Sequence, residues 1–292
     1  MNAYIRLLRP RHWIKNLFIF ATPFFAGRLF TNFNLKLCLS AFIGFSLAAS
    51  SIYILNDIRD YKTDIYHPNK KNRPIAAGII NKTTALIISG IIAVTSLIIS
   101  YKVGLIFLYF LILYMLIQIA YSLFVKDLAL GDIFSIASGF VIRVLAGGAA
   151  FNTRASKWLM LTMFMISIVL AVGKRFQEIA LLNNDAPLHR KSASKYSKEL
   201  LNEYLMISSG ASLIAYSMYT IEQQSTLVYT VPVVMFGLFR YLMVAKRGLG
   251  DPTEALTKDR ILSVTVIIWL ILVGFIGYAA RHGGIMSLIV LL

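Results

Sequence analysis

The chain has 292 residues, of which 58% are hydrophobic and only 14% are charged, and its formal net charge is +16. Soluble domains carry about 25% charged residues, so this composition excludes a soluble enzyme and a disordered chain. The only cysteine, Cys38, excludes an intrachain disulfide scaffold. We therefore predict a polytopic membrane protein.

Nine apolar stretches follow one another along the chain, each near the roughly 20 residues that a helix needs to cross a bilayer. Backbone groups in lipid must be hydrogen-bonded within the segment, so we expect helices. The predicted spans are residues 16–30, 35–55, 83–101, 103–123, 128–150, 156–172, 205–221, 226–245 and 260–280. A turn at Tyr101, Lys102 and Gly104 separates the third from the fourth, and residues 285–292 are too few to span. The pattern predicts an all-α, nine-helix transmembrane bundle, although eight or ten helices are also compatible with it.

Basic residues concentrate on one side of the predicted membrane. If the odd-numbered spans run outward, most of the 29 Lys and Arg residues lie on the side of the N-terminus. The positive-inside rule then predicts a cytoplasmic N-terminus and an external C-terminus. This bias accounts for most of the net charge, so we expect no nucleic-acid partner. Nearly all acidic residues share that side, which indicates a polar site that opens to the cytoplasm.

An acidic motif closes the second predicted span. Asn56 is followed by Asp57, Asp60 and Asp64, and spacings of three and four residues put the three carboxylates on one face of a helix. Such carboxylates need compensating cations, and oxygen ligands of this kind suit Mg²⁺ together with substrate phosphates. A solvated helix end neutralised by neighbouring basic residues is the alternative, but helix C-termini disfavour acids. We predict a Mg²⁺ site on these four residues, with the three aspartates as catalytic residues.

Basic residues follow the acidic motif and the fourth span. Residues 67–78 form a loop that contains Lys70, Arg73 and two prolines. A rigid basic loop beside a metal-bound diphosphate is suited to hold and activate a pyrophosphate leaving group, but topology signalling alone also explains such a loop. Lys126 is placed either to reach a phosphate or to extend to the membrane interface.

The fifth and sixth spans carry further charges. Asp132 and Arg143 lie on one helical stripe about 16 Å apart along the axis, too far to pair. Because ionisable residues are costly within a membrane, each needs another structural partner or an anionic ligand. Lys174, Arg175 and Glu178 lie three and four residues apart. They form either a helix-surface salt-bridge set or a second phosphate or metal site facing the acidic motif.

Two later loops carry weaker signals. Residues 191–198 mix serine with lysine and are placed to cover the site. Residues 251–254 are typical of an N-capped helix start, for which we favour a structural role.

The motifs together resemble the UbiA-type intramembrane prenyltransferase superfamily over essentially the whole chain. The matching features are the acidic motif, the sequence Arg73-Pro74-Ile75-x-x-Gly78, Lys126 after a tyrosine, and the nine predicted spans. The resemblance implies a single UbiA-like transmembrane domain over residues 1–292 with a central polar cavity. It also implies Mg²⁺ on the acidic motif, a diphosphate substrate and a polyprenyl chain in a groove open to lipid.

Two departures from the common pattern narrow the resemblance. Members that prenylate aromatic rings carry a second Asp-rich motif after span six, where this chain has Lys174, Arg175 and Glu178. The spacing from Tyr121 to Lys126 is also one residue longer. With residues 9–16, these departures are similar to the decaprenyl-phosphate phosphoribosyltransferase branch. That branch transfers phosphoribosyl from 5-phosphoribosyl 1-diphosphate (PRPP) to a polyprenyl phosphate and releases pyrophosphate. The residues that we expect to bind substrate phosphates are Lys15, Lys70, Arg73, Tyr121, Lys126, Asp132, Arg143, Lys174, Arg175 and Glu178.

Two other functions stay open from the sequence. Transfer of a polyprenyl diphosphate to an aromatic acceptor is disfavoured by the altered second motif. Transport of an anionic solute is disfavoured because polar residues gather at one end of the spans rather than at mid-membrane. The expected partners are PRPP, a polyprenyl phosphate and the lipids of a bacterial or archaeal plasma membrane. The sequence leaves open whether the protein forms a homo-oligomer.

Overall fold

The computed structural model describes residues 3–31, 34–66, 70–182, 195–223 and 225–282, and every regular element in these ranges is helical. The predicted all-α class is therefore confirmed. The predicted covering loop at 191–198 lies largely outside the described ranges, as do residues 67–69 of the basic loop and residues 285–292.

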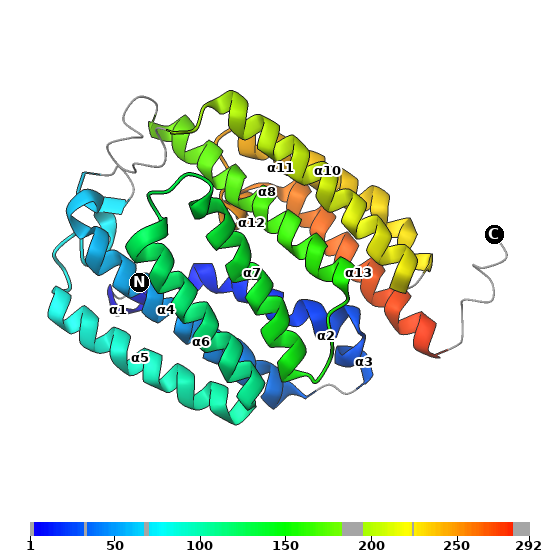
Figure 1. Cartoon of the computed structure of the whole chain (residues 1–292), viewed down its shortest axis with the longest axis horizontal. Helices are drawn as coiled ribbons and strands as arrows, with labels where there is room; N and C mark the ends of the chain where they lie inside the picture. The colour runs from blue at the N-terminus through cyan, green and yellow to red at the C-terminus, as the bar shows by residue number, and fades with distance from the viewer. Residues whose placement is uncertain (1–2, 32–33, 67–69, 183–194, 224, 283–292) are drawn as a thin grey trace.

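Long helices pack side by side in chain order (Figure 1). These helices are α4 (Leu35–Asp64), α5 (Lys82–Val103), α6 (Leu105–Ala120), α7 (Gly131–Ala150), α8 (Lys157–Leu182), α10 (Lys198–Gln223), α11 (Val231–Lys246) and α13 (Arg260–His282). Each helix in this series contacts the next one. Gly104 separates α5 from α6, which confirms the predicted turn.

In the described part of the chain, seven helical segments are long and apolar enough to cross a membrane. Their outer faces expose large apolar side chains such as Ile91 of α5, Ile106 of α6 and Ile267 of α13, as expected for contact with lipid. The protein is therefore a multi-pass membrane protein. Helix α10 covers the predicted span 205–221 and its 26 residues extend about 39 Å, but it is less apolar than the seven and packs along α8.

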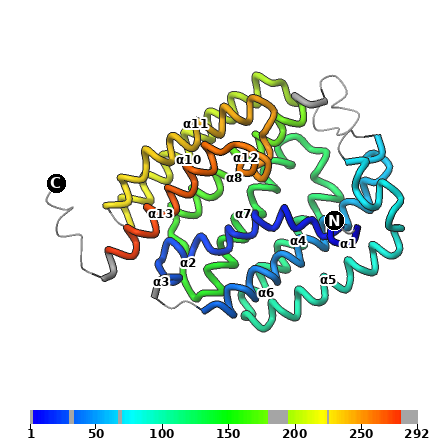
Figure 2. The backbone as a smooth tube through the Cα atoms, turned by 180° about the vertical axis from the view of Figure 1, so that it is seen from behind, coloured from blue at the N-terminus to red at the C-terminus, as the bar shows by residue number. Residues whose placement is uncertain are grey.

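The prediction of one membrane-spanning helix at residues 16–30 is wrong. After α1 (Ala3–Leu8), the chain forms the 3₁₀-helix η1 (Pro10–Phe20) and two short helices, α2 (Ala21–Phe25) and α3 (Arg28–Thr31). Gly27 has a φ of 65°, in the left-handed region where an α-helix cannot continue. Figure 2 shows this segment in blue, running across the bundle, and η1 contacts α4, α7 and α12.

A glycine of α7 allows η1 to pack this closely. A Cβ added to Gly147 would lie 1.6 Å from the carbonyl oxygen of Ile19 in η1. No larger residue fits there without separating the two elements. Asn16 of η1 is accordingly buried inside the bundle, whereas Arg11 is exposed.

Two helices extend beyond their predicted ends and carry the polar motifs. Helix α4 continues past residue 55 to Asp64, and α8 continues past residue 172 to Leu182. The acidic motif and the Lys174–Glu178 motif are therefore both helical. The short elements η2 (Lys70–Asn72), the π-helix η3 (Tyr121–Val125) and α12 (Pro252–Lys258) complete this part of the structure.

Candidate active site

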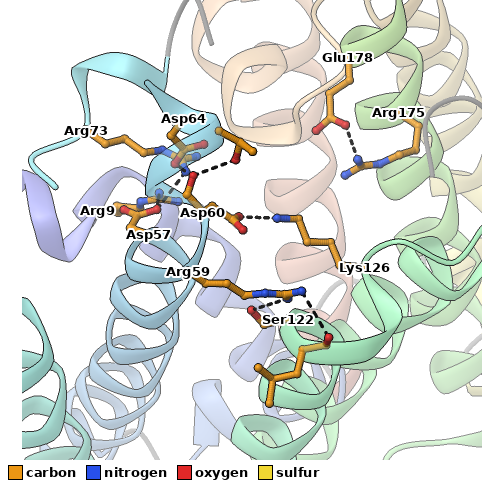
Figure 3. A network of polar contacts seen from close by, with 12 residues as sticks. Arg9, Asp57, Arg59, Asp60, Asp64, Arg73, Ser122, Lys126, Arg175 and Glu178 are labelled. Atoms are coloured by element: carbon orange, nitrogen blue, oxygen red, sulfur yellow. Dashed lines mark hydrogen bonds and ion pairs between the residues drawn. The ribbon is translucent and has the colours of Figure 1, made fainter. Parts of the chain in front are cut away.

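The acidic motif meets three basic side chains from other elements (Figure 3). Nη1 of Arg73 donates to Oδ1 of Asp57 at 3.0 Å and to Oδ2 of Asp64 at 2.6 Å. Arg9, at the start of η1, pairs with the same oxygen of Asp57. Asp57 and Asp64 are both buried. Two carboxylates seven residues apart, about two helical turns, thus converge on a single guanidinium nitrogen.

The third aspartate points toward α6 and its π-helix. Lys126, directly after η3, pairs with Oδ2 of Asp60. Arg59 donates to Oγ of Ser122 at 3.5 Å and to the carbonyl of Leu123 at 3.3 Å. These contacts fix the end of α6 beside the acidic motif and bring Lys126 next to Asp60.

A crevice of about 220 Å³ lies between α4 and the end of α6. Asn56 and Arg59 contribute its polar wall from α4, with Gln118 and Ser122 opposite. Its other lining residues are Ile52, Leu55, Ile119 and Leu123. Asn56 therefore faces an apolar crevice directly beside the aspartates.

Two of the three aspartates offer oxygen donors of the kind that a divalent cation takes. In the described residues no three His, Cys, Asp or Glu side chains converge as a ready metal cluster. The arrangement instead offers Asp57 and Asp64, with the cationic nitrogen of Arg73 between their oxygens. Mg²⁺ in proteins commonly takes one or two carboxylates plus substrate phosphate oxygens, and this pair matches that donor set.

The second motif forms an opposing wall in which Arg175 is paired with two acidic residues. Arg175 of α8 pairs with Glu178 one turn on, and its Nε lies 3.6 Å from Oδ2 of Asp132 at the start of α7. The hydroxyl of Tyr196 donates to Oδ1 of Asp132 at 2.7 Å and accepts from the amide of Leu130 at 2.6 Å. Asp132 is fully buried. It therefore positions Arg175 and lies beneath the surface of the site.

Lys70 lies between the two walls. Burial lowers the pKa of its ammonium group, and Glu178 of α8 and Asp64 of α4 both lie within electrostatic range and oppose that shift. The basic loop thus reaches from the acidic motif toward α8. The backbone carbonyl of Tyr121, at the start of η3, accepts a hydrogen bond from the backbone amide of Lys126 at 2.9 Å.

A further polar cluster joins η1, α8 and the loop before α12. Nζ of Lys15 lies 3.6 Å from Oδ2 of Asp251, and Lys174 and His12 lie within electrostatic range of the same carboxylate. Burial, reinforced by Lys15, Arg9 and Lys174, lowers the pKa of His12 to about 3, so its imidazole is neutral at pH 7. Since Arg9 pairs with Asp57, this cluster adjoins the acidic motif.

Arg143 is held inside the bundle by its own set of partners. Its Nε donates to Asn16 at 2.8 Å, Nη1 to the carbonyl of Gly139 at 2.8 Å and Nη2 to the hydroxyl of Tyr114 at 3.0 Å. The guanidinium also lies 4.6 Å from the centre of the Tyr114 ring. The stripe shared with Asp132 does not join the two residues, and the geometry of Arg143 favours the structural alternative.

The structure thus brings most of the predicted residues to one region and adds three that the prediction left out. Arg9, His12 and Asp251 all touch or face the charged clusters. The signal for the first two was the density of polar residues immediately before an apolar segment. For Asp251 the sequence showed a helix cap, and the cap is confirmed because Oδ1 accepts from the amide of Thr253 at 2.9 Å.

Comparison with known proteins gives a consistent result. The model of the UbiA prenyltransferase family matches residues 17–262. A decaprenyl-phosphate phosphoribosyltransferase of Mycolicibacterium smegmatis is 34% identical, with 94% of this chain and 92% of that protein aligned. A protein of the same name from Corynebacterium glutamicum is 30% identical over 92% of this chain and 85% of its own length.

Solved structures share the fold at lower sequence identity. A UbiA homolog from Archaeoglobus fulgidus bound to GPP and Mg²⁺ has a TM-score of 0.74 at 17% identity. The match covers 95% of this chain and 100% of that one. At this identity the likeness concerns the arrangement of helices alone.

Proposed function

The chain belongs to the UbiA prenyltransferase family, and we propose that it transfers the 5-phosphoribosyl group of PRPP to a polyprenyl phosphate and releases pyrophosphate. The relatives named decaprenyl-phosphate phosphoribosyltransferase support this assignment because they align over nearly the whole chain. Prenyl transfer to an aromatic acceptor is the competing activity within the same fold.

The basic residues of the second wall distinguish between these activities. A prenyl diphosphate presents one diphosphate, whereas the proposed reaction brings together a diphosphate, a sugar phosphate and a lipid phosphate. Arg175 and Glu178 of α8 lie across from the aspartates of α4 (Figure 3), and Arg175 is paired with Glu178 and Asp132, so Lys174 is the cation of this wall that no described residue pairs. A wall of this kind suits additional phosphates rather than a second metal on the same diphosphate.

The acidic wall suits the pyrophosphate of the donor. Asp57 and Asp64, assisted by Asn56, would hold Mg²⁺, which neutralises charge on a departing pyrophosphate. Arg73, Arg9 and the adjacent Lys70 place fixed positive charge around the same point. Preorganised charge at a leaving group stabilises the transition state because it needs no rearrangement during the reaction.

The transfer itself is a substitution at C1 of ribose. An oxygen of the lipid phosphate forms the new bond to C1 as the bond from C1 to the pyrophosphate oxygen breaks, and the electron pair leaves with pyrophosphate. A phosphate monoester is already anionic near neutral pH, so the reaction needs no strong general base. Lys126 is placed to orient an incoming phosphate beside Asp60. In-line attack inverts the configuration at C1.

The membrane position follows from the same proposal. The acidic motif, the basic loop and the α8 motif lie on the side where the basic residues concentrate, so the site faces the cytoplasm and the water-soluble donor enters from there. The polyprenyl chain of the acceptor remains in the lipid of a bacterial or archaeal plasma membrane. The apolar crevice beside Asn56 borders the acidic wall on the side of α6.

The experiment supplies purified protein in detergent with Mg²⁺, polyprenyl phosphate and either PRPP or a prenyl diphosphate with an aromatic acceptor. Mass spectrometry is expected to show a lipid that gains one phosphoribosyl unit when PRPP is the donor, and no prenylated aromatic product with the other substrates. EDTA is expected to abolish formation of the phosphoribosyl lipid. Lys174→Met tests the second wall, and we expect about a tenfold or greater rise in the KM for PRPP. A prenylated aromatic product would overturn the proposal while leaving the fold intact.

A further inference from the structure

We propose that Asp251 recognises the ribose hydroxyls of the donor while Lys15 and Lys174 bind its 5-phosphate. This inference rests on the proposed function and deepens it. It assigns a specificity role to a loop whose sequence indicates only a helix cap.

One carboxylate oxygen of Asp251 is available to a ligand. Oδ1 caps α12 by accepting from the amide of Thr253. Oδ2 lies 3.6 Å from Nζ of Lys15, beyond hydrogen-bond distance, and no residue in the described ranges donates a hydrogen bond to it. The Asp251 side chain is 14% exposed, so the carboxylate is not sealed off inside the protein.

The loop that carries Asp251 is held rigidly against α8. The backbone amide of Asp251 donates to Oε1 of Gln177 at 2.5 Å, and the hydroxyl of Tyr241 donates to the carbonyl of Gly250 at 2.7 Å. A Cβ on Gly250 would lie 1.9 Å from the carbonyl oxygen of Gly173. The backbones of the two glycines are therefore in direct contact. This contact brings the next residues along each segment, Asp251 and Lys174, close to each other.

The charges around Asp251 leave it ionised among cations. Burial alone would raise the pKa of its carboxyl group, but Lys15 and Lys174, together with His12 and the amide of Thr253, outweigh burial and lower it. No residue of the described ranges makes a hydrogen bond or ion pair with Lys174. His12 stays neutral and adds an uncharged hydrogen-bonding edge to the same cluster.

A mixed cluster of this kind selects a ligand with two chemistries. Ammonium groups bind phosphate oxygens, whereas an ionised carboxylate repels phosphate and accepts only from donors such as hydroxyl groups. A phosphorylated sugar offers both within a few ångströms. Prenyl diphosphates and polyprenyl phosphates carry no sugar hydroxyl group, so Asp251 makes no favourable contact with them. It therefore disfavours their binding at the place of the donor sugar. Acidic residues read ribose hydroxyls in dinucleotide sites by the same chemistry.

The test compares three donors across two enzymes. PRPP and its 2-deoxy and 3-deoxy analogues are compared as donors for the wild type and for Asp251→Ala, with kcat/KM measured from the phosphoribosyl lipid formed. Loss of a hydroxyl alters the intrinsic reactivity of C1, but this effect is common to both enzymes and cancels in the comparison. Asp251→Asn keeps the helix cap and serves if the alanine variant does not fold.

Asp259→Ala is the matched control. Asp259 also caps a helix, by accepting from the amide of Leu262 at 2.8 Å, and also pairs with a cation, Arg240. It takes no part in the cluster around Asp251.

We expect the wild type to prefer PRPP over at least one deoxy donor by about 10- to 100-fold, and Asp251→Ala to lose that preference while Asp259→Ala retains it. Equal losses of kcat/KM for all donors in Asp251→Ala, with the preference intact, would overturn the inference and leave the proposed function standing. A wild type that makes no phosphoribosyl lipid from PRPP would instead refute the proposed function and the inference with it.

Discussion

Replacing Asp132 with asparagine is expected to lower the free energy of unfolding by about 3 kcal/mol, because it leaves a buried charge without its partner. Asp132 is 0% exposed and Arg175 is 2% exposed, with 3.6 Å between Oδ2 and Nε. That Nε has no hydrogen bond to any other described residue. Among the described residues, the remaining partner of Arg175 is Glu178, whose side chain is 22% exposed and therefore partly screened by water.

The substitution isolates the charge from the hydrogen bonds. Asparagine keeps the shape of the side chain and an oxygen that accepts from the hydroxyl of Tyr196, now at 2.7 Å. Asp259→Asn is the matched control because its pair with Arg240, at 2.7 Å, is partly solvated. It is expected to cost about 1 kcal/mol or less, since asparagine still caps the helix.

Thermal unfolding in detergent without ligands measures both variants. Asp132→Asn is expected to lower Tm by about 6 °C or more, and the control by a few degrees at most. Replacing the pair together, as Asp132→Leu with Arg175→Met, is expected to recover the stability and to lose the transfer activity. Equal Tm values for Asp132→Asn and the control would refute the account of how Arg175 is held.

The other predictions concern the acidic motif, pH and close packing. Asp57→Asn and Asp64→Asn are each expected to abolish formation of phosphoribosyl lipid in the mass-spectrometric assay while the protein stays folded; near wild-type turnover would remove the aspartates from the mechanism. The pKa of His12 is about 3 in the folded protein, below the ordinary 6.5, so the unfolded chain binds a proton that the folded protein does not, and the wild type loses stability as the pH falls from about 6.5 toward 3. His12→Gln is expected to reduce this loss. Melting curves measured across that pH range would show the difference. Gly250→Ala is expected to lower both Tm and activity because its Cβ would meet the carbonyl of Gly173, and a wild-type Tm would contradict that contact.

The sequence predicted what depends on local spacing. The apolar stretches gave the all-α membrane class, and Asp57, Asp60 and Asp64 do lie along one helix. Lys126 does reach that motif, because the turn after α6 is short and the residue follows directly. These features are set by helical periodicity and by the length of a bilayer.

The partners of the charged residues could not be predicted in the same way. Arg9 pairs with Asp57 across 48 positions of sequence, and Asp132 pairs with Arg175 of another helix instead of any residue on its own stripe. Such contacts depend on how helices pack, which spacing along one helix does not encode. Residues 16–30 were likewise predicted as a span because they are apolar. In the structure Gly27 interrupts the helix, and Gly147 allows the segment to pack closely against α7.

The fate of one oxygen atom tests the proposed reaction most directly. PRPP labelled with ¹⁸O at the oxygen that bridges C1 and the diphosphate is incubated with the protein, Mg²⁺ and polyprenyl phosphate, and both products are examined by mass spectrometry. Attack of the lipid phosphate on C1 places the label entirely in pyrophosphate and leaves the phosphoribosyl lipid unlabelled. Label in the lipid product, or a lipid that gains no phosphoribosyl unit, would contradict the reaction proposed for this site.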